Sequence, residues 1–218
     1  MSTSLRLPST AGYETEDAKQ ALRSAVREHR ANRSARERLN AAEAISRHGV
    51  EAVGPARCVS VYVSRDLEPG THLLLDALHD RGVRILLPIL GPGLARCWAE
   101  YAGAEDLLVR APGRPPEPSG TVLGPEAIAD AEVIIAPALA VDAEGTRLGQ
   151  GGGWYDRALK HRAPDAPVFA TVYESELVEG AYLPRDVHDV AVDAVITPER
   201  WFLLEGSPFR RAGRASDL

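Results

Sequence analysis

Arg147 and a group of glycines form a candidate anion-binding loop in the second half of the chain. Gly149 and the run Gly151 to Gly153 follow this arginine, directly after a long apolar segment. Glycines remove side chains from a turn, so backbone N–H groups can approach anionic oxygens closely. The loop has neither the Gly-Lys-Ser/Thr ending of a Walker A motif nor the pattern of a dinucleotide-binding turn. A tight structural turn would carry similar glycines, so the loop alone leaves both interpretations open.

Charged residues elsewhere in the sequence favour the phosphate interpretation. Asp156 falls in the first turn of an expected helix, where a carboxylate can hold Mg²⁺ against phosphates, although an acid there also stabilises a helix by itself. Lys19 and Arg23 are four residues apart in an expected helix. That spacing places both cations on one face, so they can reach one anionic ligand together.

His188 and the two cysteines offer alternative chemistry. His188 stands beside Asp189, as a general base often does, but no nucleophile signature accompanies it, and the other histidines lack metal-ligand spacing. Cys58 and Cys97 lie in separate strand-like segments without a paired spacing. We expect both thiols to be reduced and to have no function.

Alternating helix and strand patterns must position these residues. Periodicity predicts helices, strands and one loop in the following order: helix 14–49, strand 57–64, helix 71–82, strand 83–90, strand 96–101, Pro/Gly-rich loop 111–120, helical turn 124–130, buried strand 131–141, helix 154–163, strand 167–175 and strand 187–198. This alternation predicts an α/β fold with a mostly parallel sheet covered by helices. Ligands of such sheets bind at the carboxyl ends of the strands, where strand 131–141 delivers the glycine-rich loop.

Length and composition set the class of protein. The 218 residues are 44% hydrophobic and carry a formal net charge of −6, which favours one globular domain over 13–204 between flexible tails 1–12 and 205–218. Net negative charge disfavours broad nucleic-acid binding, although the arginine-rich stretch 19–38 leaves an RNA-binding alternative. There is neither an apolar run of about 20 residues nor an export signal, so we expect a cytoplasmic protein without membrane contact.

The segment DAEGTRLGQGGGWYDRAL at 142–159 closely resembles the signature of 5-formyltetrahydrofolate cyclo-ligases. Segments resembling other landmarks of that family occur in the same order: AKQALRSAVREHR, VYVSRDLEPGTHLLLDAL, LLPIL, GRPPEP and LPRDVHDVAVDAVIT. The resemblance spans about Asp17 to Glu199. It implies a single α/β domain of the NagB/RpiA/CoA-transferase-like type, with helices on both faces of the sheet.

The resemblance also implies roles for particular residues. Lys19 and Arg147 take catalytic roles, and Asp156 and Asp189 hold Mg²⁺. The residues implied to bind ATP are Lys19, Gln20, Ala21, Leu22, Arg23, Arg147, Leu148, Gly149, Gln150, Gly151, Gly152, Gly153, Trp154 and Tyr155. Those implied to bind the folate are Val63, Glu68, Gln150, Gly151, Gly152, Gly153 and Trp154.

The implied reaction is the ATP-dependent closure of 5-formyltetrahydrofolate to 5,10-methenyltetrahydrofolate by a monomeric enzyme. The formyl oxygen attacks the γ-phosphate, N10 closes the ring and phosphate departs. Trp154, Tyr155 and Trp98 are candidates to pack against the pterin, although a place in the core suits Trp98 better. Gln150 and Gly152 stand where some relatives carry a basic residue, and Val141 stands where an aromatic residue often precedes the loop.

Other functions remain open on the same residues. A catalytically idle folate- or nucleotide-binding protein would keep the loop without turnover. A sugar-phosphate isomerase or acyl-CoA transferase on a similar scaffold would use the loop to hold a phosphate without cleaving ATP.

Overall fold

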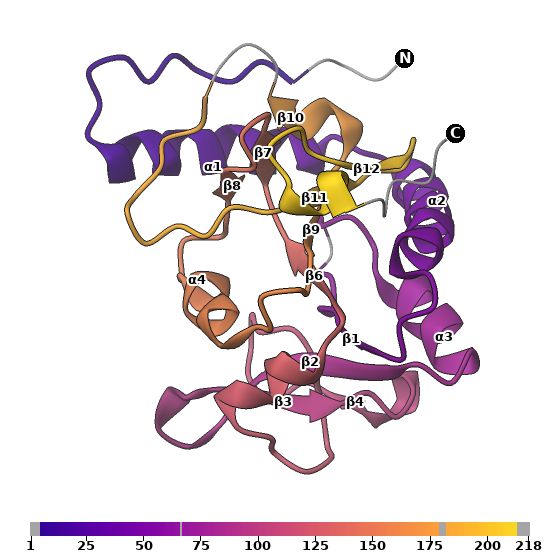
Figure 1. The fold of residues 1–218 in the computed structure, drawn as a ribbon. Coiled ribbons are helices and arrows are strands. Elements are labelled where there is room, and N and C mark those ends of the chain that lie inside the picture. Colours follow the sequence, from indigo (N-terminus) through magenta and orange to yellow (C-terminus); the bar gives the residue numbers. More distant parts are fainter. Residues whose placement is uncertain (1–4, 66, 179–181, 213–218) are drawn as a thin grey trace.

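A seven-stranded sheet forms the centre of the structure, a computed structural model that describes residues 5–65, 67–178 and 182–212 (Figure 1). The order across the sheet is β12 (Trp201–Leu203), β11 (Ala194–Ile196), β9 (Val168–Thr171), β6 (Val133–Pro137), β1 (Cys58–Ser60), β2 (Arg84–Leu90) and β3 (Arg96–Glu100). The five inner strands are parallel, and the two edge strands are antiparallel to their neighbours. The expected α/β fold with a mostly parallel sheet is confirmed.

Helices cover both faces of this sheet. The helices α2 (Ala35–Val53) and α3 (His72–Asp80) lie together on one side, while α4 (Trp154–Ala158) lies on the opposite side (Figure 1). Ile134, Ile135 and Val168 in the inner strands are fully buried. Strands covered on both faces read as continuous apolar runs, which explains the lack of polar alternation in β6 and β9.

The segment 14–49, expected as one helix, forms most of two. The first is α1 (Thr15–Ala31), and α2 begins after Ser34. The Ser34 hydroxyl accepts a hydrogen bond from the Glu37 amide at 3.2 Å, and the Glu37 carboxylate accepts one from the Ser34 amide at 2.8 Å. This reciprocal capping box starts a new helix and lets the chain turn between the two.

The apolar segment 131–141, expected as one strand, is divided between two sheets. β6 ends at Pro137, which has no N–H to continue a ladder. The chain then enters β7 (Ala140–Asp142), which pairs with β8 (Arg147–Leu148) and β10 (Leu177–Val178) in a separate three-stranded sheet. The glycine-rich loop therefore leaves this small sheet rather than the central one.

Helix α1 packs against the small sheet. Leu22 and Val26 on α1 form a buried cluster with Leu139 and Leu148. The residues at Leu5 and Leu7, in the segment expected to be a tail, are half-buried against the same cluster. This packing fixes the face of α1 that carries the cations relative to the loop after β8.

Other expected elements differ mainly in length. The helix expected over 154–163 is α4 followed by the 3-10 turn η4 (Leu159–His161), and the strands expected over 57–64 and 187–198 shorten to β1 and β11. The expected loop 111–120 contains the short strand β5 (Glu117–Pro118), which pairs with β4 (Leu107–Leu108). The remaining 3-10 turns are η1 (Pro92–Leu94), η2 (Ala104–Asp106), η3 (Pro125–Asp130), η5 (Glu174–Glu176) and η6 (Pro208–Ala212).

Three expectations about the periphery can be compared with the described residues. Cys58 and Cys97 are both free thiols, as expected. The segment 205–218 was expected to be a flexible tail. Its described part forms η6 and buries Ser207, and residues 213–218 are outside the described part. None of the helices in the described ranges is both long and apolar enough to cross a membrane.

The turn between β7 and β8 requires glycine at position 145. Gly145 has φ +80°, and a Cβ built there would lie 2.4 Å from the Val192 backbone oxygen. We expect Gly145→Ala to lower the free energy of unfolding by about 2 to 4 kcal/mol, from left-handed backbone strain and overlap together. Gly82→Ala is the matched control, because Gly82 has φ +73° with nothing within 4 Å of the added Cβ. Equal losses in urea unfolding of both variants would contradict this account.

Candidate functional site

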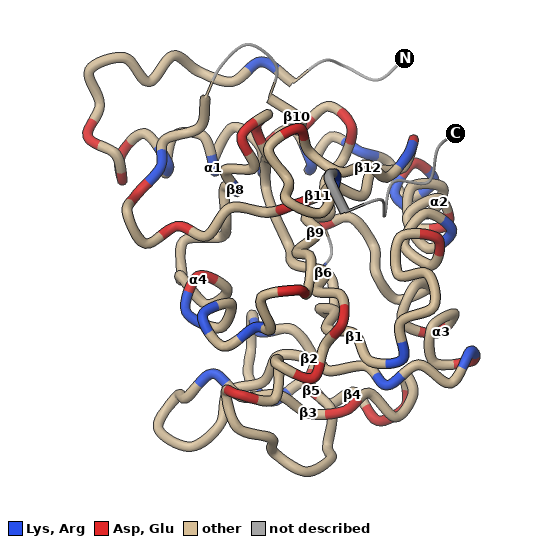
Figure 2. The backbone as a smooth tube through the Cα atoms, in the orientation of Figure 1, with Lys and Arg blue, Asp and Glu red and all other residues tan. Residues whose placement is uncertain are grey.

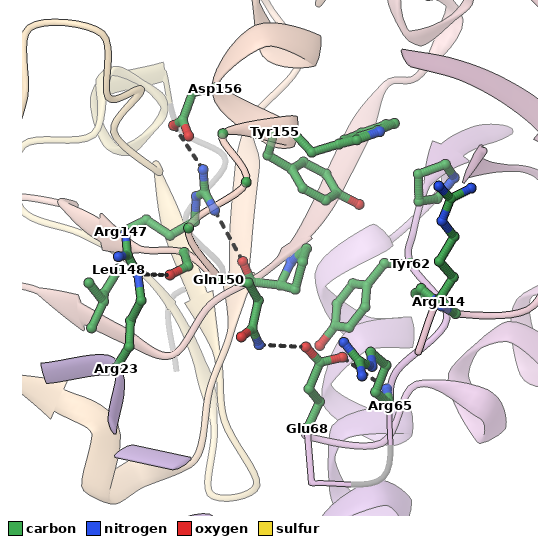
Figure 3. A pocket seen from close by; sticks show the side chains of 18 of the residues that line it. Arg23, Tyr62, Arg65, Glu68, Arg114, Arg147, Leu148, Gln150, Tyr155 and Asp156 are labelled. Carbon is green, nitrogen blue, oxygen red and sulfur yellow. Dashed lines mark hydrogen bonds and ion pairs between the residues drawn. The ribbon is translucent and has the colours of Figure 1, made fainter. Parts of the chain in front are cut away.

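A cavity of about 480 Å³ opens where three central strands end. Residues beyond the carboxyl end of β1, the last residue of β6 and the last residues of β2 contribute to its wall, which is where an open α/β sheet is expected to bind ligands. Its other walls are α1, the glycine-rich loop with the start of α4, and the segments 114–117 and 186–189. Figure 3 shows labelled side chains from α1, from the segment after β1, from position 114 and from the glycine-rich loop with the start of α4 around one space.

Helix α1 presents two cations to this cavity. Lys19 and Arg23 both line it, although their side chains are largely buried. Arg23 donates from Nε to the Gly149 carbonyl oxygen at 3.0 Å and from Nη1 to a Glu16 carboxylate oxygen at 2.6 Å. The predicted meeting of the Lys19 helix and the glycine-rich loop in one cleft is therefore observed.

The glycine-rich loop leaves its backbone amides free. Within the described residues, the N–H groups of 150–153 make no hydrogen bond. The carbonyl oxygens of Gly149 and Gln150 instead accept from arginines on α1. Because C=O and N–H point in opposite directions across a trans peptide, the amides that follow these carbonyls point away from those arginines. Gly151 and Gly153 have φ of +103° and +57°, a conformation that favours glycine.

Two carboxylates pair with the cations of the site. Arg147 donates to Asp156 at 2.9 Å, and Lys19 donates to Asp189 at 2.5 Å. The Val190 amide also donates to Asp156 at 3.3 Å, which ties the two acids into one cluster. Burial opposes ionisation of Asp189, but hydrogen bonds from the Asp186 amide and Lys19 outweigh it and hold the pKa of Asp189 below its ordinary value. Asp189 is therefore ionised at neutral pH.

Two buried polar groups in the cavity wall lack a partner among the described residues. They are Nε of Arg147 and the hydroxyl of Tyr155. Burial raises the pKa of Tyr155, an effect opposed by Arg147, so its hydroxyl remains a protonated donor. Buried donors are normally hydrogen-bonded, so both are unsatisfied donors beside the cavity.

The wall opposite the glycine-rich loop carries Val63 and Glu68. Val63 is buried in the wall, while Glu68 accepts from the Arg65 amide at 2.9 Å and from the Gln150 side-chain amide at 2.8 Å (Figure 3). Trp154 also lines the cavity, and its ring lies edge-on to Trp98 at 5.0 Å between centroids. Trp98 is fully buried outside the wall and thus belongs to the core, as its alternative interpretation predicted.

The structure does not bring every predicted residue to the cavity. Leu22 lies in the hydrophobic cluster behind α1, and Gln20 and Ala21 are outside the wall. His188 is at the rim, but only its backbone amide makes a described hydrogen bond, to Asp186. The other predicted site residues line the wall: Lys19, Arg23, Val63, Glu68, the loop Arg147 to Tyr155, Asp156 and Asp189.

Some wall residues were missed in the sequence. The Pro-rich segment 114–117 appeared as a landmark of the resemblance but received no role, and Tyr62 and Pro137 were interpreted as parts of strands. The missed residues are Glu16, Tyr62, Arg65, Pro88, Ile89, Leu90, Arg114, Pro115, Pro116, Glu117, Pro137 and Asp186. Some of these residues could have been found from their position at the carboxyl ends of predicted strands, because those ends share one edge of the sheet with the candidate loop.

Charge in the cavity is mixed. The cations in its wall are Lys19, Arg23, Arg65, Arg114 and Arg147, and the acids are Glu16, Glu68, Glu117, Asp156, Asp186 and Asp189. Acidic and basic positions are likewise interspersed along the chain in Figure 2. An anionic ligand here meets a local group of cations in a protein of negative net charge.

Comparison with known proteins decides the family. The profile of the 5-formyltetrahydrofolate cyclo-ligase family matches residues 15–198. The chain belongs to this family. A 5-formyltetrahydrofolate cyclo-ligase of Mycolicibacterium smegmatis is 43% identical over 149 residues, which cover 66% of this chain and 75% of the relative. The Escherichia coli 5-formyltetrahydrofolate cyclo-ligase is 33% identical over 149 residues, covering 66% and 80%.

Solved structures agree with this membership of the cyclo-ligase family. The 5,10-methenyltetrahydrofolate synthetase of Aquifex aeolicus superposes with a TM-score of 0.72 at 27% identity, covering 92% of this chain and 96% of the other. The synthetase of Mycoplasma pneumoniae superposes with a TM-score of 0.63 at 18% identity, covering 82% and 97%, and supports the fold. The resemblance noted in the loop 142–159 is thus confirmed across most of the chain.

Proposed function

We propose that the protein closes 5-formyltetrahydrofolate to 5,10-methenyltetrahydrofolate, with cleavage of ATP to ADP and phosphate. One observation carries the proposal: the free amides of the glycine-rich loop, Lys19 and Arg147 share a cavity with Glu68 and Val63. The loop amides and the two cations suit a triphosphate, while Glu68 and Val63 border the part of the cavity left for the folate. Membership of the cyclo-ligase family supports the same reaction.

The loop and its cations would hold the triphosphate. Backbone N–H groups of 150–153 donate to phosphate oxygens, while Lys19 and Arg147 neutralise their charge. Nε of Arg147, buried without a described partner, is a ready donor for one of these oxygens. Phosphoryl transfer depends on positioning and on stabilising the charge of the transferred group, which this arrangement supplies.

The chemistry needs no covalent protein intermediate. The formyl oxygen attacks the γ-phosphorus, and the bond from that phosphorus to the ADP oxygen breaks. N10 then attacks the activated formyl carbon and loses its proton, and the carbon–oxygen bond breaks to release phosphate. Concentrated positive charge stabilises both ADP and phosphate as leaving groups.

The folate would lie against the opposite wall. Glu68 already accepts one hydrogen bond on each carboxylate oxygen, and each oxygen retains capacity for another donor. The pterin ring offers N–H donors of that kind. Val63 and Trp154 supply apolar contact area beside the acid, and the Tyr155 hydroxyl supplies one further donor.

The acids of the site fit Mg²⁺ bound together with a nucleotide. The described residues contain no group of three or more potential ligand side chains. Mg²⁺ commonly uses only one or two protein carboxylates with substrate phosphates, as Asp156 and Asp189 would provide. Asp156 and Asp189 lie within hydrogen-bond distance of Arg147 and Lys19, so these acids would hold the ion next to the cations proposed to bind the phosphates.

We expect Asp156→Asn to raise the Mg²⁺ concentration for half-maximal activity about tenfold, because a neutral amide is a weaker ligand than a carboxylate. The measurement is initial rate against free Mg²⁺ at saturating ATP and folate. Asp165→Asn is the matched control, since Asp165 is exposed and outside the cavity wall. An unchanged Mg²⁺ requirement in Asp156→Asn would remove this acid from the metal site.

The proposal includes the setting expected from the sequence: a cytoplasmic monomer that binds neither nucleic acid nor membranes. Net negative charge supports the exclusion of nucleic acid. The location, the monomeric state and the lack of nucleic-acid or membrane binding are separate from the proposed reaction, which does not depend on them.

A product assay tests the proposed reaction. Purified protein is incubated with 5-formyltetrahydrofolate, Mg²⁺ and ATP, and the methenyl product is followed by its absorbance. We expect product only when ATP is present, with one ADP released for each product molecule. Binding of both ligands without product would instead favour a folate- and nucleotide-binding protein that has lost turnover.

A further inference from the structure

Arg27 is outside the cavity wall but holds one residue that lines it. Its Nη2 donates to the Gln150 backbone oxygen at 3.2 Å and to the Gln150 side-chain oxygen at 2.9 Å. One guanidinium nitrogen thus contacts both the main chain and the side chain of the same loop residue. These contacts restrict the path of the loop and the direction of the Gln150 side chain.

Gln150 uses the other end of its amide across the cavity. Its Nε2 donates to Oε1 of Glu68 at 2.8 Å (Figure 3). Glu68 is held in turn through Oε2 by the Arg65 amide. Arg27, Gln150 and Glu68 therefore form a continuous bridge from α1 through the glycine-rich loop to the turn after β1.

A glutamine amide suits the middle of this bridge. Its oxygen can only accept, as Arg27 requires, and its nitrogen can only donate, as the Glu68 carboxylate requires. A lysine at position 150 would pair with Glu68 but would repel Arg27. Arg27 and Gln150 therefore form a matched pair in this chain.

We propose that Arg27 is a positioning residue that couples nucleotide binding to folate binding through Gln150. The inference rests on the proposed function, because it takes the loop as the nucleotide side and Glu68 as the folate side. A nucleotide that orders the loop also orders Gln150 against Glu68. The folate then binds an acid that is already oriented, and thermodynamic linkage makes the effect reciprocal.

The bridge is solvent-accessible, so the expected coupling is modest. Arg27 and Gln150 are exposed, and water competes for their hydrogen bonds. The two charge-assisted hydrogen bonds of the Gln150 side chain, to Arg27 and to Glu68, support in such a setting a coupling factor of about fivefold, at the low end of the usual range.

The test measures affinities of the full-length chain by calorimetry. The dissociation constant of 5-formyltetrahydrofolate is determined with and without a saturating non-hydrolysable ATP analogue and Mg²⁺, for the wild type and several variants. We expect the analogue to tighten folate binding about fivefold in the wild type and less than about twofold in Arg27→Met. Arg27→Lys should keep part of the coupling, because an ammonium group can still donate to an oxygen.

Two further variants complete the test. Gln150→Leu removes both side-chain contacts of the bridge and should lose the coupling as Arg27→Met does. Arg36→Met is the matched control, because Arg36 is an exposed arginine at the start of α2, outside the cavity wall. It should retain the wild-type ratio.

Several results would overturn the inference, and each is distinguishable from failure of the proposed function. Wild-type protein that binds both ligands without mutual effect overturns it, as does a full wild-type ratio in Arg27→Met or Gln150→Leu. If Arg27→Met weakened folate binding equally with and without the ATP analogue, Arg27 would have only a structural role. Wild-type protein that binds neither ligand would refute the proposed function itself.

Discussion

Lys19→Met is expected to lower kcat/KM for ATP by about a hundredfold or more. Lys19 presents its ammonium to the cavity from a largely buried position, and it pairs only with Asp189 among the described residues. Removal of one preorganised cation from a phosphoryl-transfer site typically costs about 3 kcal/mol in the transition state, or about two orders of magnitude in rate. Steady-state kinetics with ATP as the varied substrate measures this loss.

The control is the same substitution at an exposed lysine. Lys160 lies on η4 outside the cavity wall, so Lys160→Met should retain wild-type kinetics. The Lys19 variant should still fold, because Asp189 is 20% exposed and keeps its hydrogen bond from the Asp186 amide. A loss below about threefold in folded Lys19→Met would remove Lys19 from the phosphate site.

Glu176→Leu is expected to destabilise the protein by about 3 to 5 kcal/mol. Glu176 and Arg30 form a bidentate ion pair at 2.7 and 2.8 Å, and their side chains are 0% and 1% exposed. Burial alone would lower the pKa of Arg30, but Glu176 more than restores it, so the guanidinium is charged. Loss of the carboxylate leaves that charge buried without its partner. Urea unfolding provides the measurement.

The double variant Arg30→Met/Glu176→Leu separates an unpaired charge from a general packing defect. Replacement of both partners by apolar side chains should recover at least half of the loss, because no buried charge remains. Recovery is incomplete, since the Ala138 oxygen and the Tyr173 amide each lose a hydrogen bond. A double variant as unstable as Glu176→Leu would show that packing, rather than charge, dominates at this position.

This ion pair also contributes to the geometry of the site. Arg30 donates to the Ala138 oxygen at 2.7 Å, between the end of β6 and the start of β7. It therefore fixes the last turn of α1 against the strands that lead to the glycine-rich loop. The buried pair thereby helps to place Lys19 and Arg23, which lie earlier on the same helix.

The position of the site could be predicted because it depends on local rules. Four-residue spacing put Lys19 and Arg23 on one helical face, and the apolar run 131–141 put the glycine-rich loop near the carboxyl edge of the central sheet, although the loop itself leaves the small sheet at β8. The pairing of Lys19 with Asp189 could not be predicted in this way. Such pairs join residues far apart in the chain, and their distances depend on the tertiary packing of α1 against the small sheet.

Two predictions about the fold were wrong because sequence patterns alone do not determine where an element ends. The apolar run 131–141 had the composition of one buried strand, but Pro137 ends β6 and the chain continues in another sheet. Hydrophobicity indicates burial without indicating which sheet a strand joins. The break at Ser34 is different, because a Ser-x-x-Glu capping box is readable in the sequence, although it did not enter the prediction of one helix.

Nuclear magnetic resonance offers the most direct test of the proposal that the backbone amides of the glycine-rich loop bind the nucleotide phosphates. The protein, labelled with ¹⁵N-glycine, is titrated with a non-hydrolysable ATP analogue and Mg²⁺, and amide shifts are recorded. We predict saturable shifts for Gly151, Gly152 and Gly153 while Gly82, in a turn outside the cavity wall, does not move. Unshifted resonances at 151–153 under saturating analogue would contradict the assignment of these amides to the nucleotide.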